Sequence, residues 1–448
     1  MGVIVETCGI WRGVGVKLLC LSNGHGEDIV AVRILRSLQK QPAAPEIAAL
    51  PLVGLGQAYT KLDNVPIVGP VQAMPSGGFV YMDGGQLWQD LRSGLVRLTW
   101  QQFKVIRDRA RCGWTILAVG DILPLLLAWL SGADYAFVGT SRSEYYIRDE
   151  SGVLERRNWR ERFESFWGSV YLPWERALLR SRRCKAVFVR DELTAEKLEE
   201  FSISALNPGN PMMDDLDVEN PAPLFNRADA ELEEMQRRLT FVLLPGSRTP
   251  EAYANWQKII VAIAGLVESY REKSPVFLGA IAPGLSLELL RETLEKYGWQ
   301  ANSRIDATAD ANADANTFGL RDSGAIAFTL DSATLILSQK SFVQCLQKAD
   351  LAIAMAGTAT EQFVGLGKPA IAIPGKGPQF TPAFAEAQSR LLGPSLILAK
   401  RPRDIPAIVG QLLGDPDRLQ LIAENGDRRM GKPGASNRIA ACLIERLE

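Results

Sequence analysis

Short apolar runs alternate with stretches of helical periodicity along most of this 448-residue chain. The clearest example lies within residues 351–393. The apolar run Leu351–Met355 is followed by small residues and then by Ala359–Leu366, which fits one short helix. Another apolar run, Pro369–Ile373, precedes a helical pattern over Pro382–Leu392. This stretch therefore predicts a strand, a glycine-bearing turn, a helix and a second strand, which together form a βαβ unit.

The turn of this βαβ unit has the features of an anion site. Helix amides after Gly357 carry partial positive charge, which suits a diphosphate. Either Thr358 or Thr360 can cap the helix start. Glu361 lies one turn into the helix, too close to a phosphate to be its partner and better placed for sugar hydroxyls. The spacing alone also allows an ordinary βαβ turn without a ligand.

A strand, a loop and a helix are also predicted near the amino end. Val16–Leu21 is an apolar run, residues 22–28 form a loop, and Ile29–Leu38 has near-helical spacing. The loop contains His25, the only histidine of the chain. Because histidine titrates near neutrality, His25 is a candidate general base for an acceptor hydroxyl. The alternative is a loop histidine packed on a helix end.

Repeated alternation of this kind predicts an α/β protein with two Rossmann-like parallel-sheet domains. We expect an amino-terminal domain over residues 16–210, a proline-rich linker over 211–237, a carboxy-terminal domain over 238–425 and a last helix within 426–448. The length of the chain fits two or three domains. Ligands of open α/β sheets lie at the carboxyl ends of the strands, so we expect the functional residues there.

Two blocks of the second half resemble a known family. Ala356–Glu361, followed by Gly367–Pro374, is similar to the nucleotide-sugar motif of GT-B glycosyltransferases. Phe241–Arg248 resembles the Leu-Leu-Pro-Gly-Ser-Arg segment that opens the donor domain of lipid-A-disaccharide synthase. The lipid-II-forming N-acetylglucosaminyltransferase and monogalactosyldiacylglycerol synthase are more distant matches. The resemblance is good over residues 240–395 and patchy over residues 16–215.

The resemblance implies a GT-B enzyme whose two domains face each other across a cleft, with the last helix returning to the amino-terminal domain. It also implies an inverting, metal-independent hexosyltransferase of lipid biosynthesis, which moves a sugar from a UDP-sugar donor to a lipid acceptor without a further cofactor. A bidentate guanidinium contact from Arg248 suits the donor diphosphate. The donor-binding residues expected from the two blocks are Gly246, Ser247, Arg248, Gly357, Thr358, Thr360, Glu361 and Gln379.

The resemblance implies that the catalytic groups lie in the amino-terminal domain. His25 is similar to the histidine of a Gly-Gly-His loop in the two more distant families. Lipid-A-disaccharide synthase has Gly-Glu-Ser-Gly-Asp there, which Glu27 and Asp28 match. Asp121 resembles a catalytic aspartate of an Ile-Asp-x-Pro-Asp turn, although Leu125 replaces the second aspartate. We expect His25 to be the base and Asp121 to orient it or the acceptor. The alternatives for Asp121 are the role of base and that of a helix cap.

Two basic stretches rich in aromatic residues suggest a membrane surface. Residues 87–112 have a helical pattern with basic residues between apolar ones, and residues 155–185 interleave arginines with Trp, Phe and Tyr. Such composition is typical of segments that rest on lipid headgroups. An ordinary protein surface and an RNA-binding surface are the alternatives. No apolar run reaches the ~18 residues of a membrane span, and the best one, Ile122–Leu130, is much shorter.

Composition narrows the class of protein. A content of 47% hydrophobic and 23% charged residues is ordinary for a globular protein, and a net charge of −1 gives no general attraction to nucleic acid. The six cysteines have no metal-ligand spacing, and a single histidine excludes a histidine-based zinc site. Scattered cysteines suggest the reducing cytosol. We therefore expect a cytoplasmic, peripherally membrane-associated transferase with no nucleic-acid partner.

Two other functions remain open at this stage. One is a non-catalytic GT-B scaffold, and the other is a UDP-sugar epimerase or hydrolase. Epimerases of this kind use several acidic and histidine groups, so a chain with one histidine disfavours them.

Overall fold

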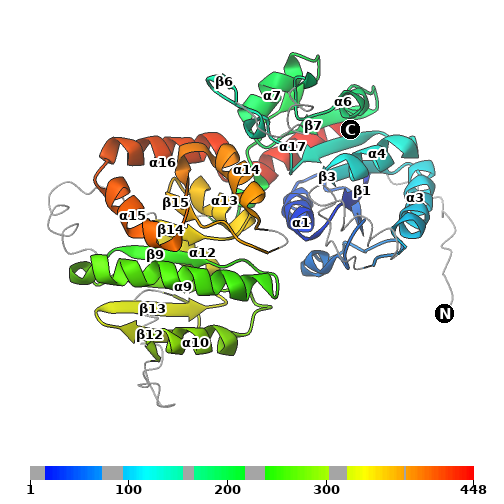
Figure 1. The fold of residues 1–448 in the computed structure, drawn as a ribbon. Coiled ribbons are helices and arrows are strands. Elements are labelled where there is room, and N and C mark those ends of the chain that lie inside the picture. The colour runs from blue at the N-terminus through cyan, green and yellow to red at the C-terminus, as the bar shows by residue number, and fades with distance from the viewer. Residues whose placement is uncertain are drawn as a thin grey trace. The chain divides into compact units, whose positions relative to one another are not determined.

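The computed structural model describes residues 16–72, 94–154, 166–216, 238–301, 320–377 and 380–447, apart from the side chain of His25. The chain divides into two compact units. Unit 1 comprises Met1–Asp214 and Gly431–Glu448, and unit 2 comprises Asp215–Met430. Each unit contains one large sheet with helices packed on it (Figure 1).

The sheet of unit 1 is parallel throughout and has six strands in the order β2-β1-β3-β4-β7-β8. These strands are β1 (Lys17–Ser22), β2 (Glu46–Pro51), β3 (Thr115–Gly120), β4 (Tyr135–Gly139), β7 (Cys184–Phe188) and β8 (Ala205–Leu206). A separate hairpin pairs β5 (Arg148–Asp149) with β6 (Gly152–Val153). Every residue of β4 is buried. Such continuous apolar strands are expected where helices cover both faces of a parallel sheet, and the strand expected at Val16–Leu21 is confirmed as β1.

Helices cover both faces of the unit 1 sheet. On one face, α1 (His25–Gln39) packs beside α17 (Ala435–Leu447). The other face carries α3 (Leu95–Arg111), α4 (Ile122–Ser131), α6 (Pro173–Leu179) and α7 (Glu192–Glu199). Successive residues of β1 serve the two cores in turn, because Leu18 faces α1 whereas Leu19 faces the other helices. Short 3-10 turns are η1 (Gln57–Lys61), η2 (Glu144–Tyr146) and η3 (Pro211–Met213).

The sheet of unit 2 has eight strands in the order β11-β12-β13-β10-β9-β14-β15-β16. Those strands are β9 (Thr240–Leu244), β10 (Val276–Ala280), β11 (Gln300–Ala301), β12 (Ile326–Leu330), β13 (Ala333–Ser338), β14 (Leu351–Ala354), β15 (Ala370–Ala372) and β16 (Leu396–Leu398). From β13 to β16 all neighbours are parallel, whereas β11 and β12 add to one edge in antiparallel fashion.

The helices of unit 2 include the two that the sequence predicts over Ala359–Leu366 and Pro382–Leu392. They are α9 (Glu251–Ser269), α10 (Leu287–Lys296), α12 (Phe342–Lys348), α13 (Thr358–Gly365), α14 (Pro382–Leu392), α15 (Ile405–Leu413) and α16 (Pro416–Met430), with 3-10 turns η4 (Arg271–Lys273), η5 (Gly393–Ser395) and η6 (Pro402–Asp404). The range 426–448 thus contains the end of α16, in unit 2, and all of α17, in unit 1. Among the helices that the structure describes, none is both long and apolar enough to span a bilayer.

Candidate functional site

The donor-side residues expected from the sequence converge at one edge of the unit 2 sheet. Strands β9 and β14 are parallel neighbours, so their carboxyl ends lie at the same edge. The segment Pro245–Arg248 and the turn at residues 356–358 therefore leave the sheet side by side. They approach closely, since a Cβ placed on Gly246 would lie 3.2 Å from the carbonyl oxygen of Met355. The φ angle of +95° at position 246 also favours glycine.

The first turn of α13 has no side-chain cap. Gly357 occupies the N-cap position, and the expectation that a threonine caps this helix is wrong. Thr358 is exposed, and the buried Thr360 hydroxyl donates to the carbonyl of Ala356 at 2.6 Å. Glu361, in the same turn, is partly exposed. The amides of Thr360 and Glu361 donate to the carbonyl of Gly357, so an anion at this helix start would meet the amides of Thr358 and Ala359.

A residue that the sequence did not single out, Gln388 on α14, supports this turn. Its side chain is 2% exposed, and its Nε2 donates to the carbonyls of Gly357, at 3.0 Å, and Ala356, at 3.3 Å. Its Oε1 is buried and has no hydrogen-bond partner in the described part of the chain. Gln388 thus fixes the backbone that precedes α13. The pattern of apolar and polar residues in this amphipathic helix does not distinguish Gln388 from an ordinary helix glutamine, so the sequence does not reveal this role.

Arg248 lies beside a buried carboxylate at the start of α9. Burial lowers the pKa of Arg248, while the charge of Glu251 acts in the opposite direction. The Oε1 atom of Glu251 accepts a hydrogen bond from the amide of Phe380 at 2.7 Å. A Cβ placed on Gly377 would lie 2.3 Å from the carboxyl carbon of Glu251, so Glu251 holds the loop before α14 against α9. Gln379, also expected to bind the donor, lies outside the described residues.

The catalytic candidates gather at the carboxyl edge of the unit 1 sheet, where β1 and β3 are neighbours. Asn23 Nδ2 donates to Asp121 Oδ1 at 3.0 Å. The same oxygen accepts the amide of Leu123 at 3.0 Å, so Asp121 caps α4. A Cβ on Gly120 would lie 3.4 Å from both Asn23 Cβ and Glu27 Cγ. Asn23, Glu27 and Asp121 therefore form one cluster.

The loop expected over residues 22–28 is too long, because α1 begins at His25. Gly24 stands at the N-cap with φ 131°, a conformation that favours glycine. Glu27 and Asp28 follow in the first turn, where the helix dipole favours carboxylates. His25, Glu27 and Asp28 are therefore helix residues, which corrects the prediction that they lie on a loop. The side chain of His25 lies outside the described part of the structure.

Burial shifts the proton affinity of the carboxyls in this cluster. It raises the pKa of Glu27 to about 7, and the negative charges of Asp121 and Asp28 contribute further. It raises the pKa of Asp28 to about 6, against the hydrogen bond from Ser22. The pKa of Asp121 is also raised by burial, although hydrogen bonds and the charge of Arg142 oppose this. Within the described residues, no group of three or more His, Cys, Asp or Glu side chains is placed to hold a metal ion.

A buried hydrogen-bond network lies beneath the start of α1. Ser22 Oγ donates to Asp28 Oδ1 at 2.5 Å and lies 2.6 Å from the hydroxyl of Tyr59. Tyr59 in turn lies 4.0 Å from the Cys20 sulfur. All of these groups are buried, so they fix the first turn of α1 to the sheet. None of Ser22, Asn23 and Tyr59 was predicted as part of the site, although the first two directly follow an expected strand.

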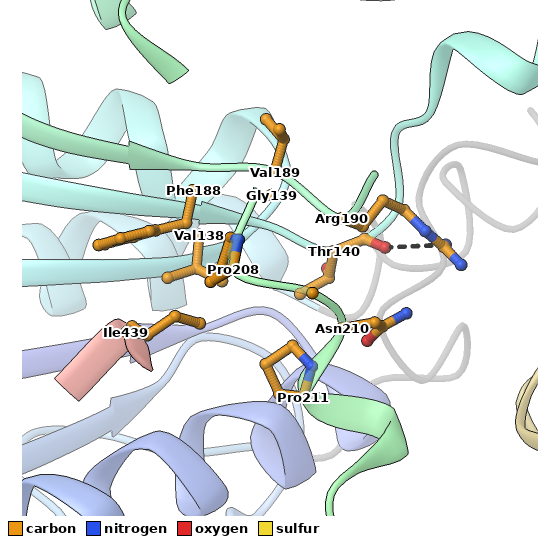
Figure 2. A pocket seen from close by; sticks show the side chains of 11 residues that line it. Val138, Gly139, Thr140, Phe188, Val189, Arg190, Pro208, Asn210, Pro211 and Ile439 are labelled. Carbon is orange, nitrogen blue, oxygen red and sulfur yellow. Dashed lines mark hydrogen bonds between the residues drawn. The ribbon is translucent and has the colours of Figure 1, made fainter. Parts of the chain in front are cut away.

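A pocket opens elsewhere on the same sheet edge, at the ends of β4 and β7 (Figure 2). Figure 2 shows apolar side chains at one end of the pocket, among them Val138, Phe188 and Ile439. The polar side chains at the other end include Thr140, Arg190 and Asn210. Arg190 Nη1 donates to the carbonyl of Thr140 at 3.1 Å. The hydroxyl of Thr140 is buried without a hydrogen-bond partner in the described structure. The lining of this pocket includes none of the expected catalytic residues.

No protein-family model and no curated protein matches the chain. Solved structures match it over nearly its whole length. MurG from Acinetobacter baumannii aligns at 14% identity over 96% of this chain and 99% of that one, with a TM-score of 0.53. The chain has the GT-B fold. The predicted fold class, with two Rossmann-like parallel-sheet domains, is therefore confirmed.

Two further GT-B structures agree. The UDP-GlcNAc 2-epimerase from Neisseria meningitidis, bound to UDP-GlcNAc, aligns at 15% identity over 96% of this chain and 100% of that one, with a TM-score of 0.51. The glycotransferase of kitacinnamycin aligns at 13% identity over 97% of this chain and 100% of that one, with a TM-score of 0.52. At such identities the similarity describes the fold and not the reaction.

Proposed function

We propose that this protein is a glycosyltransferase that binds a UDP-sugar on unit 2 and transfers the sugar to a lipid acceptor. The observation that carries the proposal is the convergence of Pro245–Arg248 and the start of α13 at one sheet edge. That edge presents glycine backbone, helix amides and a guanidinium, which are the groups that bind a diphosphate. One structural neighbour is bound to UDP-GlcNAc, which supports UDP as the nucleotide.

Each donor-side residue has a role in this proposal. Arg248 and the first amides of α13 bind the diphosphate and stabilise the negative charge that leaves with it, without a metal ion. Glu361, which is partly exposed in the first turn of α13, accepts hydrogen bonds from the ribose hydroxyls. The resemblance of Phe241–Arg248 and Ala356–Glu361 to lipid-A-disaccharide synthase supports the same assignment.

A surface of unit 1 supports a lipid acceptor and peripheral membrane binding. Helix α4 packs against both α3 and α6, and we call the solvent side of these helices the α3–α4 face. Its exposed apolar side chains are Val96, Trp100, Leu126, Trp129, Leu130 and Trp174. Lys104 lies 5.7 Å from the ring centroid of Trp100, and Arg183 lies 5.9 Å from that of Trp129.

Exposed apolar groups flanked by cations are typical of surfaces that contact anionic membranes. Trp100 is 59% exposed and Leu130 is 46% exposed, so the α3–α4 face would bury substantial apolar area on contact. The face contains the described part of the predicted helix 87–112 and part of the stretch 155–185. Residues 155–165 of that stretch lie outside the described structure.

A UDP-sugar epimerase is the second candidate, because the UDP-GlcNAc 2-epimerase aligns with this chain about as well as MurG and the kitacinnamycin glycotransferase do. Incubation with UDP-GlcNAc in the absence of any acceptor separates the two reactions, and NMR of the sugar gives the readout. We expect UDP to raise the thermal unfolding temperature, and we expect the nucleotide sugar to stay unchanged until a lipid extract is added. Accumulation of an epimer without acceptor would favour the epimerase instead.

A further inference from the structure

The cluster at the carboxyl edge of the unit 1 sheet has a surplus of hydrogen-bond acceptors. Asn23 is 2% exposed, and its Nδ2 donates to Asp121. Its Oδ1 is buried with no hydrogen-bond partner among the described residues. A buried oxygen without a donor is destabilising, and the ionised carboxylates of Glu27, Asp28 and Asp121 add acceptors only. Uptake of one proton within the cluster would reduce this imbalance.

Of the three carboxyls, Glu27 is the one best placed to take that proton from a ligand. Asp121 is engaged by two donors, the amide of Asn23 and the backbone of Leu123. Asp28 is only 3% exposed and accepts the hydroxyl of Ser22. Glu27 is partly exposed, and no described side chain donates a hydrogen bond to it. Burial and its negative neighbours raise its pKa to about 7, which suits a base that works near neutrality.

We propose that Glu27 is the general base of the transfer, and that Asp121 is a positioning residue that tunes it. This inference rests on the proposed function. The Glu27 carboxylate takes the proton of the acceptor hydroxyl while the acceptor oxygen bonds to the anomeric carbon. The bond from that carbon to the diphosphate oxygen breaks, and its electron pair leaves with UDP. Glu27 then releases the proton to solvent. His25, the base expected from the sequence, is not required for this step.

The electrostatic surroundings of Glu27 define how the reaction responds to pH. The pKa of Glu27 is raised by the negative charges of Asp28, on the same helix, and of Asp121, in the turn between β3 and α4. The charge of Arg142, in the loop after β4, lowers the pKa of Asp121. The charge of Asp28 raises the pKa of Tyr59 in η1. Because only ionised Glu27 accepts a proton, kcat should rise as the pH rises through about 7. Below that pH it should fall by about tenfold per pH unit.

The test is the pH profile of kcat for transfer from UDP-GlcNAc to a lipid extract. Glu27→Gln should lower kcat by ~10²–10⁴ and leave the UDP affinity unchanged. Asp121→Asn removes a negative neighbour, so the acidic limb should move to lower pH. His25→Gln should keep the limb near its original position. Glu199→Gln, an exposed carboxylate change on α7, is the matched control and should behave as the wild type.

Two outcomes would overturn the inference, and both differ from failure of the proposed function. Near-normal kcat in Glu27→Gln, or loss of the acidic limb in His25→Gln, would remove Glu27 as base while transfer itself stands. NMR titration of the glutamate carboxyl carbons without substrate gives a second readout, with Glu27 identified by its variant. A signal that titrates near the ordinary value of ~4.3 would also contradict the inference. If no UDP-sugar is transferred at all, the proposed function fails and the base role fails with it.

Discussion

Replacement of Arg248 by alanine is the sharpest test of the donor site. Arg248 ends the segment Pro245–Arg248, which leaves the sheet beside the turn before α13. It is partly buried, which lowers its pKa, and a desolvated guanidinium binds an anion more strongly than an exposed one. A hydrogen bond to a charged group contributes about 1.5–3 kcal/mol. Arg248→Ala should therefore raise the Kd for UDP by about 10–150-fold.

Isothermal titration calorimetry with UDP gives this Kd directly. The matched control is Arg271→Ala, which removes another arginine of unit 2. Arg271 is exposed and pairs with Asp331 at 3.5 Å, so its loss should leave the Kd unchanged. Thermal unfolding of both variants checks that they are folded. A Kd for Arg248→Ala within about twofold of the wild type would refute the proposed role of the guanidinium.

The remaining predictions concern the ribose, the buried carboxyl and the membrane. Glu361→Ala should weaken UDP but not pyrophosphate, with the exposed Glu268→Ala on α9 as control; equal losses for both ligands would contradict a ribose contact. Burial raises the pKa of Asp28 to about 6, so the stability that this group contributes is present below its unfolded pKa and is lost as pH rises through about 6. Relative to the wild type, Asp28→Asn should therefore gain about 2 kcal/mol more in free energy of unfolding at pH 7 than at pH 4; a denaturant titration with the same gain at both pH values would oppose this. The wild type should float with anionic vesicles at low ionic strength and less at high ionic strength, and Trp129→Ser should float less; flotation that does not depend on salt, or none, would remove the membrane assignment.

Much of unit 2 could be predicted from the sequence because its signals are local. Buried parallel strands are short apolar runs, and glycine or proline marks where helices stop. Strand β14 and helix α14 accordingly have nearly the predicted bounds. The antiparallel hairpin of β12 and β13 was not predicted, because the pattern does not show where a strand is placed in a sheet.

The parts of the site that were missed depend on contacts between distant residues. Asn23 and Asp121 are 98 positions apart, and Ser22 and Tyr59 are 37 apart. Nothing in the spacing of these residues indicates that they meet. The raised pKa of Glu27 has the same origin, since burial and the charge of Asp121, which follows another strand, produce it. The sequence therefore favours His25, because the ordinary pKa of histidine is near neutrality without any shift from its surroundings.

The central claim is that a sugar moves from UDP to a lipid. The most direct measurement follows a radiolabelled UDP-sugar incubated with the protein and vesicles made from a lipid extract. The account predicts that label enters the organic-soluble fraction while an equal amount of UDP is released, and that Arg248→Ala slows both at limiting donor. Label that stays water-soluble, either as unchanged nucleotide sugar or as its epimer, would contradict the account.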